Sequence, residues 1–384
     1  MSATLHAWLI DFGTLTATLA ALYLTGACFA VQRRLPPWPR TPREWPPVTV
    51  LKPLCGVEAA TYQCLRSFCV QAYPRYQVLF GVHAETDAAV AIVNRLRREF
   101  PAADLRCVVD GRAHGGNRKV GNLLNMMRAA RYDYLVIADS DIRVPPQYLR
   151  TVVAPLLDDG VGIVTCAYRA DPQPGLWSVI GACFINEWFL PSVRIAAWLG
   201  SRAFAFGATI AIRRGVLEEI GGFEALAGQL ADDYRLGELT RSIGLGTVLS
   251  QLEVETSVEE RSFAELRGHM LRWLRTIREV RPVGYALSIV TFGVPVAAIG
   301  SLLAGNAPPA LAMLCAAAAA RIMLHWTMRR PAAPFWHWLV LPLGDLLSLA
   351  LWCWGFAARS VQWRHDRYQL TGNGSVRRCE DLNP

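Results

Sequence analysis

A long run without any charged side chain, at residues 12–31, limits what the start of this chain can form. Its length matches the hydrocarbon core of a bilayer crossed by one helix. A cleaved signal peptide would give a similar apolar signal. No basic region precedes the run, however, and Gln32-Arg33-Arg34 follows it where a small-residue cleavage site would be needed. We therefore expect a retained transmembrane anchor at residues 1–34.

Three further apolar blocks follow residue 282, at 284–304, 309–327 and 335–357, and they account for much of the 53% hydrophobic content. If all three crossed the bilayer, the Arg-rich tail at 359–378 would lie outside, against the positive-inside rule. Either one block is re-entrant or interfacial, or the hydropathy count is wrong. We expect one block that does not cross.

The chain has a net charge of +8, and its Arg residues cluster beside the apolar blocks. Cytoplasmic loops and anionic lipid headgroups favour basic residues in such places. No basic and aromatic stripe or known module is present, so we expect no nucleic-acid partner. The ten cysteines show no Cys-X-X-Cys pair or Cys/His metal spacing. This pattern indicates reduced thiols on the cytoplasmic side and no structural zinc site.

Strand-like and helix-like segments alternate after a Pro-rich linker at 35–47. Strands are expected at 48–54, 76–83, 105–110 and 132–138, and helices at 61–72, 87–100 and 117–130. This alternation predicts the α/β class with a mostly parallel, right-handed sheet. A dinucleotide-binding fold is disfavoured because Lys52-Pro-Leu-Cys-Gly56 stands where a Gly-X-Gly-X-X-Gly motif would follow the first strand.

The alternation loosens after residue 141. We expect strands at 161–168, 203–214 and 247–256, a helix at 231–243, an apolar segment at 181–199, and a basic amphipathic helix at 262–280. Gly207 marks a close approach within the second of these strands. The predicted domains are a catalytic domain at 48–260, an interfacial helix at 261–282, a membrane block at 283–358 and a basic cytoplasmic tail at 359–384.

Two carboxylates, Asp139 and Asp141, lie where the strand at 132–138 ends. Ligands bind at the carboxyl ends of strands in open α/β sheets. Oxygen ligands at i and i+2 suit a hard divalent cation that carries a nucleotide diphosphate. A bare Asp-X-Asp also occurs in surface turns, which is the alternative for this pair taken alone.

Three other features carry candidate chemistry. Asp87 follows the second strand, where a helix N-cap is the alternative. Asp232-Asp233 begins the helix at 231–243. His269, Arg272 and Trp273 share one helical face, which a membrane-surface anchor would also explain.

The order of these features resembles that of membrane-bound inverting glycosyltransferases with a GT-A fold. The closer resemblance is to the ceramide glucosyltransferase-like family, which includes bacterial enzymes that glycosylate hopanoid lipids. It covers nearly the whole chain, and the motifs that carry it are Asn117-Arg-Lys119-Val-Gly-Asn122-Leu, Asp139-Ser-Asp-Ile-Arg-Val144, Ala231-Asp-Asp233-Tyr, the His-X-X-Arg-Trp motif at 269–273 and Trp363-Arg-His-Asp-Arg367-Tyr368.

The resemblance implies a role for each position. Asp87 would bind the uracil or ribose of a UDP-sugar, Lys119 would lie near the nucleotide or its phosphates, and Asn122 would support that loop. Asp139 would hold the ribose or metal side, and Asp141 would coordinate Mg²⁺ or Mn²⁺. Asp233, directly before Tyr234, would be the general base. Arg272 would meet the diphosphate, and Trp273, His269 and Gly207 would shape the acceptor entrance.

Two positions depart from the family pattern. The family's usual Gln or Arg is His269 here, which would either titrate near neutral pH or substitute as a plain hydrogen-bonding group. Some relatives have Gly where this chain has Asp141, so metal dependence would differ among them.

The expected reaction moves a sugar from a UDP-sugar to a membrane-lipid hydroxyl, at the cytoplasmic face of a bacterial inner membrane. The forms Phe206-Gly-Ala-Thr209 and His-X-X-Arg-Trp are more similar to the hopanoid branch than to the sphingolipid branch. This resemblance implies N-acetylglucosamine and bacteriohopanetetrol, with glucose and ceramide as the alternative. A processive polysaccharide synthase would need more spans. A non-catalytic lipid-binding scaffold would not need all three acidic positions.

Two charged residues, Arg321 and Asp345, fall within the apolar blocks. Asp345 is costly in lipid, so it is either functional or the cap of a helix break after Pro342. Arg321 is expected to extend its charged end to the cytoplasmic interface.

Overall fold

The computed structural model describes residues 3–39, 42–329, 334–357, 360–363, 366–370 and 376–378. The chain divides into two compact units, each described by itself. The sheet unit comprises Leu35–Asp171, Ser201–Glu259 and Asp366–Pro384, and the helical unit comprises Met1–Arg34, Pro172–Gly200 and Glu260–His365. The segment Pro172–Gly200 therefore groups with the apolar helices, whereas the sequence predicts it within the catalytic domain at 48–260.

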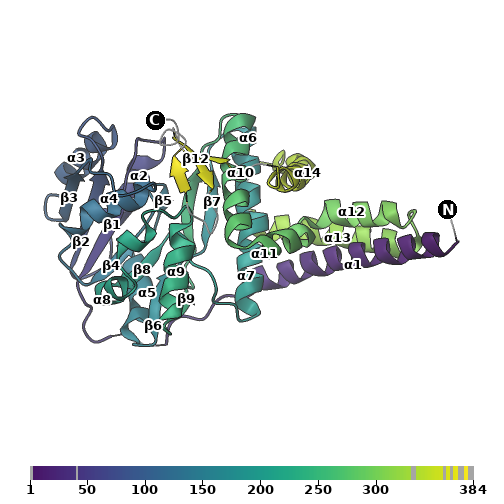
Figure 1. Cartoon of the computed structure of the whole chain (residues 1–384), viewed down its shortest axis with the longest axis horizontal. Helices are drawn as coiled ribbons and strands as arrows, with labels where there is room; N and C mark the ends of the chain where they lie inside the picture. The colour runs from purple at the N-terminus through teal and green to yellow at the C-terminus, as the bar shows by residue number, and fades with distance from the viewer. Residues whose placement is uncertain are drawn as a thin grey trace. The chain divides into compact units, whose positions relative to one another are not determined.

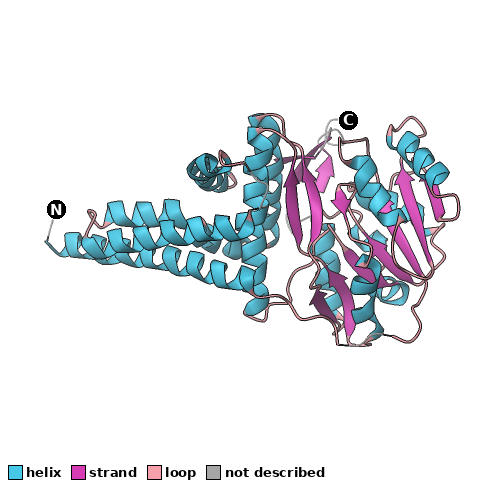
Figure 2. Ribbon diagram, turned by 180° about the vertical axis from the view of Figure 1, so that it is seen from behind, coloured by secondary structure: helices cyan, strands magenta, loops and turns pink. Residues whose placement is uncertain are grey.

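The sheet unit is built on a seven-stranded sheet in the order β3-β2-β1-β4-β8-β6-β9 (Figures 1 and 2). Its strands are β1 (Val48–Pro53), β2 (Tyr76–Val82), β3 (Asp104–Val109), β4 (Tyr134–Ile137), β6 (Val161–Thr165), β8 (Ile210–Arg213) and β9 (Gly246–Leu249). Strands β3, β2, β1 and β4 are parallel, β8 is antiparallel to both neighbours, and β6 and β9 are parallel. The predicted α/β class and mostly parallel sheet are confirmed.

Both faces of the sheet are covered by apolar side chains because successive residues of a strand point to opposite faces. Val136 of β4 packs in one buried cluster, and its neighbours Leu135 and Ile137 pack in another. The helical segments of this unit are α2 (Thr61–Cys69), α3 (Ala89–Glu99), α4 (Arg118–Met127), α5 (Tyr148–Val153), η1 (Ala154–Leu157), α8 (Arg214–Glu219), η3 (Phe223–Leu226) and α9 (Asp232–Ser242).

A second, three-stranded sheet has the order β5-β10-β7, formed by β5 (Ile142–Arg143), β7 (Tyr168–Pro172) and β10 (Val254–Val258). The single strand predicted at 247–256 is therefore wrong, because β9 and β10 occupy that stretch and belong to different sheets. The strand predicted at 203–214 is shorter than expected, since only β8 is extended. The loop before β8 is held instead by Thr165, whose hydroxyl accepts the backbone N–H of Phe206 at 2.9 Å.

The helical unit contains α1 (Ala3–Gln32), α6 (Leu176–Phe184), the π-helical stretch η2 (Ile185–Phe189), α7 (Leu190–Trp198), α10 (Phe263–Val280), α11 (Pro282–Leu287), η4 (Ser288–Thr291), α12 (Gly293–Leu303), α13 (Pro308–Met328) and α14 (His337–Trp354). Figure 1 shows α1, α12 and α13 side by side. Small residues allow this approach, as at other membrane helix contacts. A Cβ built on Gly13 would lie 2.3 Å from the carbonyl oxygen of Gly300.

Four helical segments among the described residues are long and apolar enough to cross a membrane: Thr4–Gln32, Leu176–Trp198, Pro308–Met328 and His337–Trp354. The second was expected only as an apolar segment. The block at 284–304 forms a pair, Pro282–Thr291 and Gly293–Leu303, bent by 78°, which is the form of a broken span or a re-entrant loop. A non-crossing block remains a prediction.

The two charged residues of the apolar blocks pair with each other. The guanidinium of Arg321 is buried and donates to both carboxylate oxygens of Asp345, at 2.8 to 3.0 Å. The expectation that Arg321 extends to the interface is wrong. Helix α14 continues through Pro342, so Asp345 does not cap a helix break. Small strands follow at β11 (Ser360–Trp363), β12 (Asp366–Leu370) and β13 (Val376–Arg378), and the rest of the predicted tail lies outside the described residues.

Candidate active site

Strand β4 ends just before Asp139, and this carboxylate lies against a lysine from helix α4. Asp139 Oδ1 is 2.7 Å from Lys119 Nζ, and Asp232 Oδ2 is 3.5 Å from the same amine. Helix α4 is positioned by its N-cap, because the side chain of Asn117 accepts the backbone N–H of Val120 and donates to Asp232. The predicted donor-site residues Lys119 and Asp139 therefore meet the Asp232-Asp233 pair.

Lys119 is held as a cation by its neighbours. Burial alone would favour the neutral amine, but the carboxylates of Asp139, Asp232 and Asp233 outweigh it and raise the pKa of Lys119. The side chain is only 15% exposed. A fixed positive charge therefore lies among three carboxylates at this end of the sheet.

Asp233 lies in the first turn of α9 and accepts two backbone hydrogen bonds. Tyr234 N donates to Oδ1 at 2.7 Å, and Gly207 N donates to Oδ2 at 2.8 Å. Burial and the nearby charge of Asp232 raise the pKa of Asp233 to about 6, against the opposing effects of Lys119 and the two N–H groups. A carboxylate with this pKa is deprotonated at neutral pH and basic enough to accept a proton.

Gly207 lies at the centre of these groups. A Cβ built on it would be 3.0 Å from Lys119 Nζ, 3.1 Å from Asp139 Oδ2 and 3.5 Å from Asp233 Oδ2. Residues that are far apart in the sequence thus converge on one backbone position. The close approach predicted at Gly207 is confirmed, although it lies in the loop before β8 rather than within a strand.

Asp141 is oriented from the second sheet. One of its carboxylate oxygens accepts the hydroxyl of Thr256 in β10, and its backbone carbonyl accepts the thiol of Cys64 at 3.2 Å. Asp139 uses Oδ1 for Lys119. Each of the two carboxylates keeps an oxygen that these contacts do not use. A partly exposed, oxygen-only donor set of this kind fits a hard divalent cation.

Two residues predicted for the donor site, Asp87 and Asn122, form hydrogen bonds with backbone groups in this structure. The carboxylate of Asp87 accepts Gly56 N at 2.9 and 3.1 Å and Ala89 N at 2.9 Å, so it joins the loop after β1 to the start of α3. The buried amide of Asn122 donates to the carbonyl oxygens of Gly81 and Leu54. These contacts support the loops around the site, and a direct nucleotide contact by Asp87 remains a prediction.

Lys52 belongs to the site but was not singled out from the sequence. Its side chain is fully buried, donates to the backbone carbonyl oxygen of Asp139, and lies 4.1 Å from the ring centroid of Phe68. Burial lowers the pKa of Lys52 to about 8, although the nearby Asp141 and Asp139 oppose this shift. The available signal was a lysine inside an apolar strand, since a charge in that place needs a specific partner.

His269, Arg272 and Trp273 lie on α10 in the helical unit, whereas the carboxylates belong to the sheet unit. His269 Nδ1 is 2.6 Å from Glu260 Oε1, and its ring packs edge-on against Trp273 at 4.7 Å. Trp273 also contacts Phe184 and Phe189. The predicted helix at 261–282 is present, and the roles of these three residues stay predictions.

The family model described as "Glycosyl transferase family 21" matches residues 13–376. The chain belongs to this family. Ceramide glucosyltransferase 1 of Caenorhabditis elegans is 28% identical over 60% of this chain and 49% of its own length. A ceramide glucosyltransferase of Komagataella phaffii is 33% identical over 25% of this chain and 20% of its own length. The chain thus spans at most about half the length of these relatives.

Among solved structures, a mannosyltransferase from Pyrobaculum calidifontis, in complex with GDP-Man and Mn²⁺, superimposes with a TM-score of 0.51. Its sequence identity is 21%, and the match covers 92% of this chain and 95% of that chain. At this identity the likeness shows the fold alone, and it confirms the expected GT-A architecture. The family match and the two ceramide glucosyltransferases confirm the resemblance to the ceramide glucosyltransferase-like family. The hopanoid branch remains a prediction.

Proposed function

We propose that this chain is an inverting hexosyltransferase that moves a sugar from a UDP-sugar to a hydroxyl of a membrane lipid. The observation that carries the proposal is the convergence of Lys119, Asp139 and Asp233 around Gly207, with Asp233 of pKa about 6. Membership of Glycosyl transferase family 21 and the apolar helices support a lipid acceptor at a membrane.

The proposed reaction is one in-line displacement. The lipid oxygen forms a bond to the anomeric carbon as the bond from that carbon to the diphosphate oxygen breaks, and UDP leaves with the electron pair. Asp233 takes the proton of the lipid hydroxyl. Lys119 lies beside this carboxylate and Asp139, so its charge would stabilise the departing diphosphate.

Asp139 and Asp141 would hold a divalent cation, as the oxygen donors described above fit one. When bound, Mg²⁺ or Mn²⁺ would neutralise charge that builds on the diphosphate. Asp87 would meet the uracil or ribose, with Asn122 supporting the loop. Arg272 would meet the diphosphate, and His269, Trp273 and Gly207 would border the acceptor entrance. The proposed setting is a bacterial inner membrane with the sheet unit in the cytoplasm.

The acceptor has two candidates. The names of the curated relatives support glucose and ceramide. The resemblance of the Phe206-Gly-Ala-Thr209 form to the hopanoid branch supports N-acetylglucosamine and bacteriohopanetetrol. A polysaccharide synthase is less suited, because the described residues contain four helices of spanning length, or five if the bent pair is one span.

Incubation of the purified protein with labelled UDP-glucose or UDP-N-acetylglucosamine and each lipid separates these candidates. Transfer to a single lipid identifies the acceptor. The wild type is compared with Asp233→Asn in the same preparation. Absence of transfer with all four pairs in the presence of Mn²⁺ and Mg²⁺ would reject the proposed function in favour of a non-catalytic scaffold. Full transfer by Asp233→Asn would reject Asp233 as the general base.

Removal of divalent cations is expected to stop transfer, and added Mn²⁺ or Mg²⁺ is expected to restore it. In Asp141→Asn one cation ligand loses its charge, so we expect the half-maximal Mn²⁺ concentration to rise by about 10- to 100-fold. Titration of activity with Mn²⁺ measures this. Glu238→Gln, on the exposed surface of α9, is the control and should titrate as the wild type. An unchanged Mn²⁺ requirement in Asp141→Asn would contradict the metal role.

Lys52→Met tests whether the buried amine positions the cation site. The backbone carbonyl of Asp139 would lose its hydrogen-bond donor. The positive charge near the carboxylates of Asp139 and Asp141 would also be removed. We expect about tenfold lower activity, recovered in part at high Mn²⁺. Thr49→Val, which removes a buried polar group from the same strand, is the control. A loss that no Mn²⁺ concentration relieves would indicate a purely structural role.

A further inference from the structure

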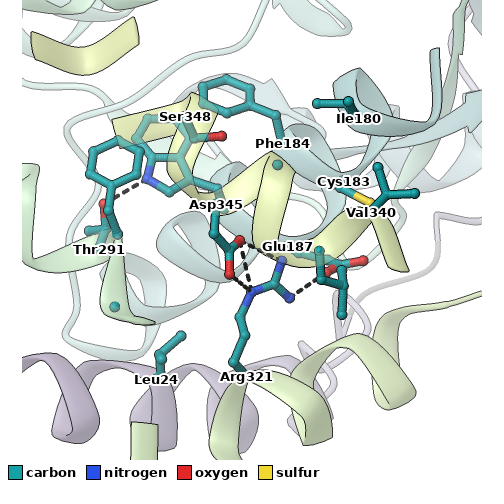
Figure 3. Close-up of a pocket in the computed structure, with 15 residues that line it drawn as sticks. Leu24, Ile180, Cys183, Phe184, Glu187, Thr291, Arg321, Val340, Asp345 and Ser348 are labelled. Atoms are coloured by element: carbon teal, nitrogen blue, oxygen red, sulfur yellow. Dashed lines mark hydrogen bonds and ion pairs between the residues drawn. The ribbon is translucent and has the colours of Figure 1, made fainter. Parts of the chain in front are cut away.

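A small cavity, with about 30 Å³ of space for the centre of a water-sized sphere, lies among the helices of the helical unit (Figure 3). It is lined by residues of α1, α6, η2, η4, α13 and α14, together with the Phe292–Gly293 junction. All lining residues belong to that unit. This space admits a small polar end group, such as a hydroxyl, and not a whole small molecule.

One side of the cavity is a charged cluster centred on Arg321. Its guanidinium donates to Asp345 through Nε and Nη2, and to Glu187 Oε2 through Nη1 at 2.5 Å (Figure 3). The second oxygen of Glu187 is 2.7 Å from Nδ1 of the buried His325. These ionisable groups come from η2, α13 and α14, each within a helix of spanning length. Such groups are costly in lipid and usually mark a functional site.

The charges of this cluster select the kind of ligand. Two carboxylates face one guanidinium, and the guanidinium is already engaged by both. A phosphate or other anion would therefore meet excess negative charge without a free cationic partner. Asp345 is the more exposed carboxylate, at 20% against 4% for Glu187. Its oxygens offer hydrogen-bond acceptors, which suit a ligand that donates, such as a hydroxyl.

Another part of the cavity lining is aromatic. The rings of Phe184 and Trp188 stack at 4.5 Å, and Trp188 stacks on Phe292 at 5.6 Å. The indole N–H of Trp188 donates to Thr291 at 2.6 Å, so the polar atom of this wall is satisfied within the protein. A flat aromatic wall next to acceptor oxygens matches a molecule with an apolar body and a hydroxyl-bearing end.

We propose that this cavity binds the hydroxyl-bearing end of a neutral membrane lipid. That this lipid is also the sugar acceptor rests on the proposed function, whereas the binding itself does not. A metal ion is a weaker occupant. Cys183, Glu187 and His325 place ligand atoms within 4.8 Å of one another, but the oxygens of Glu187 already bind Arg321 and His325. The nearby guanidinium would also repel a cation.

A pocket-filling variant tests the proposal. Gly344 lines the cavity, and a Cβ built on it would meet only Ile180 Cγ2, at 3.9 Å, so Gly344→Leu has room to occupy the space. Leu346→Phe is the matched control, because Leu346 is on the same helix and 61% exposed. Ser348→Leu, at another lining position, is a second filling variant in case Gly344→Leu does not fold.

Native mass spectrometry of the full-length protein in nanodiscs measures the bound lipid. Each sample contains ceramide, bacteriohopanetetrol, dioleoylglycerol or dioleoylphosphatidylglycerol. We expect a retained adduct with at least one of the three neutral lipids. It should fall by about tenfold in a filling variant and persist in Leu346→Phe. No adduct with a neutral lipid, equal retention in the filling variants, or equal retention of the anionic phosphatidylglycerol would overturn the proposal.

Asp233→Asn separates this proposal from the proposed function. The variant should keep the lipid adduct and lose transfer, because Asp233 lies in the sheet unit and the cavity in the helical unit. If the wild type binds the lipid through the cavity but transfers no sugar, binding stands and the proposed function fails. If it transfers sugar while filling variants keep the same adduct and the same KM for the lipid, the cavity assignment fails alone.

Discussion

Asp233→Asn is expected to lower kcat for sugar transfer by about 10²- to 10⁴-fold, with a small change in the KM of the UDP-sugar. The substitution removes the group that accepts the proton and keeps the size of the side chain. Its amide can replace only one of the two acceptors that Gly207 N and Tyr234 N use. Initial rates with saturating lipid give both constants. Asp232→Asn is the comparison, and an equal loss there with an active Asp233→Asn would move the base to Asp232.

The pH profile follows from the same carboxylate. Its pKa is about 6, so the fraction in the basic form falls as pH falls through 6. We expect kcat/KM of the wild type to rise with pH up to a plateau above pH 7. A profile that is flat between pH 5 and 7.5 would contradict Asp233 as the base.

The effect of Asp233→Asn on the stability of the protein should be opposite to its effect on activity. The pKa of Asp233 is raised on folding, so its charged form is less favourable in the folded state, and this cost is present above pH 6. Asp233→Asn removes this cost, so we expect a higher melting temperature at pH 7.5, reduced by the cost of the one backbone N–H that loses its acceptor. The gain should shrink as pH falls through 6 towards 4. An inactive and more stable variant would indicate a carboxylate retained for chemistry rather than for folding.

The first half of the sheet unit could be predicted because its pattern is local. Buried parallel strands read as short apolar runs, and the intervening helices read by their 3.6-residue period. Strands β1 to β4 and helices α2 to α4 lie within a few residues of their expected positions. Asp139 and Asp141 made the carboxyl end of β4 a candidate site, and the order of the other motifs favoured this interpretation over a surface turn.

The second half depends on contacts between distant segments. Thr247 and Thr256 both fit one alternating strand, yet β9 pairs with β6 and β10 with β5. Alternation is the same in either sheet, so it could not show where one strand ends and the next begins. Arg321 posed a similar problem. Its partners Glu187 and Asp345 are on separate helices, and a helix taken alone suggested an interfacial position.

Only part of the site could be predicted, because some of its contacts also join distant segments of the chain. Motif order identified Lys119, Asp139 and Asp233, and the structure brings them together. Lys52 escaped notice because its partner is a backbone carbonyl, which no side-chain pattern reveals. The neighbours of Gly207 were also hidden, since they come from three other segments of the chain.

Gly207→Ala is expected to lower transfer by about 10²-fold and to leave the melting temperature near that of the wild type. The new Cβ would lie 3.0 Å from Lys119 Nζ and 3.1 Å from Asp139 Oδ2, so both must shift by a few tenths of an ångström. These atoms end side chains and can move without unfolding the protein. Small displacements of reacting or charge-stabilising groups are costly to catalysis, however.

Gly215→Ala separates this effect from a general cost of replacing glycine in the same unit. Within the described part of the chain, no atom lies within 4 Å of a Cβ built on Gly215, so that variant should keep full activity. The backbone at Gly207 has no positive φ, and strain therefore does not explain a loss there. Activity of Gly207→Ala within about twofold of the wild type would mean that Lys119, Asp139 and Asp233 need not hold their observed spacing, and the proposed catalytic arrangement would be wrong.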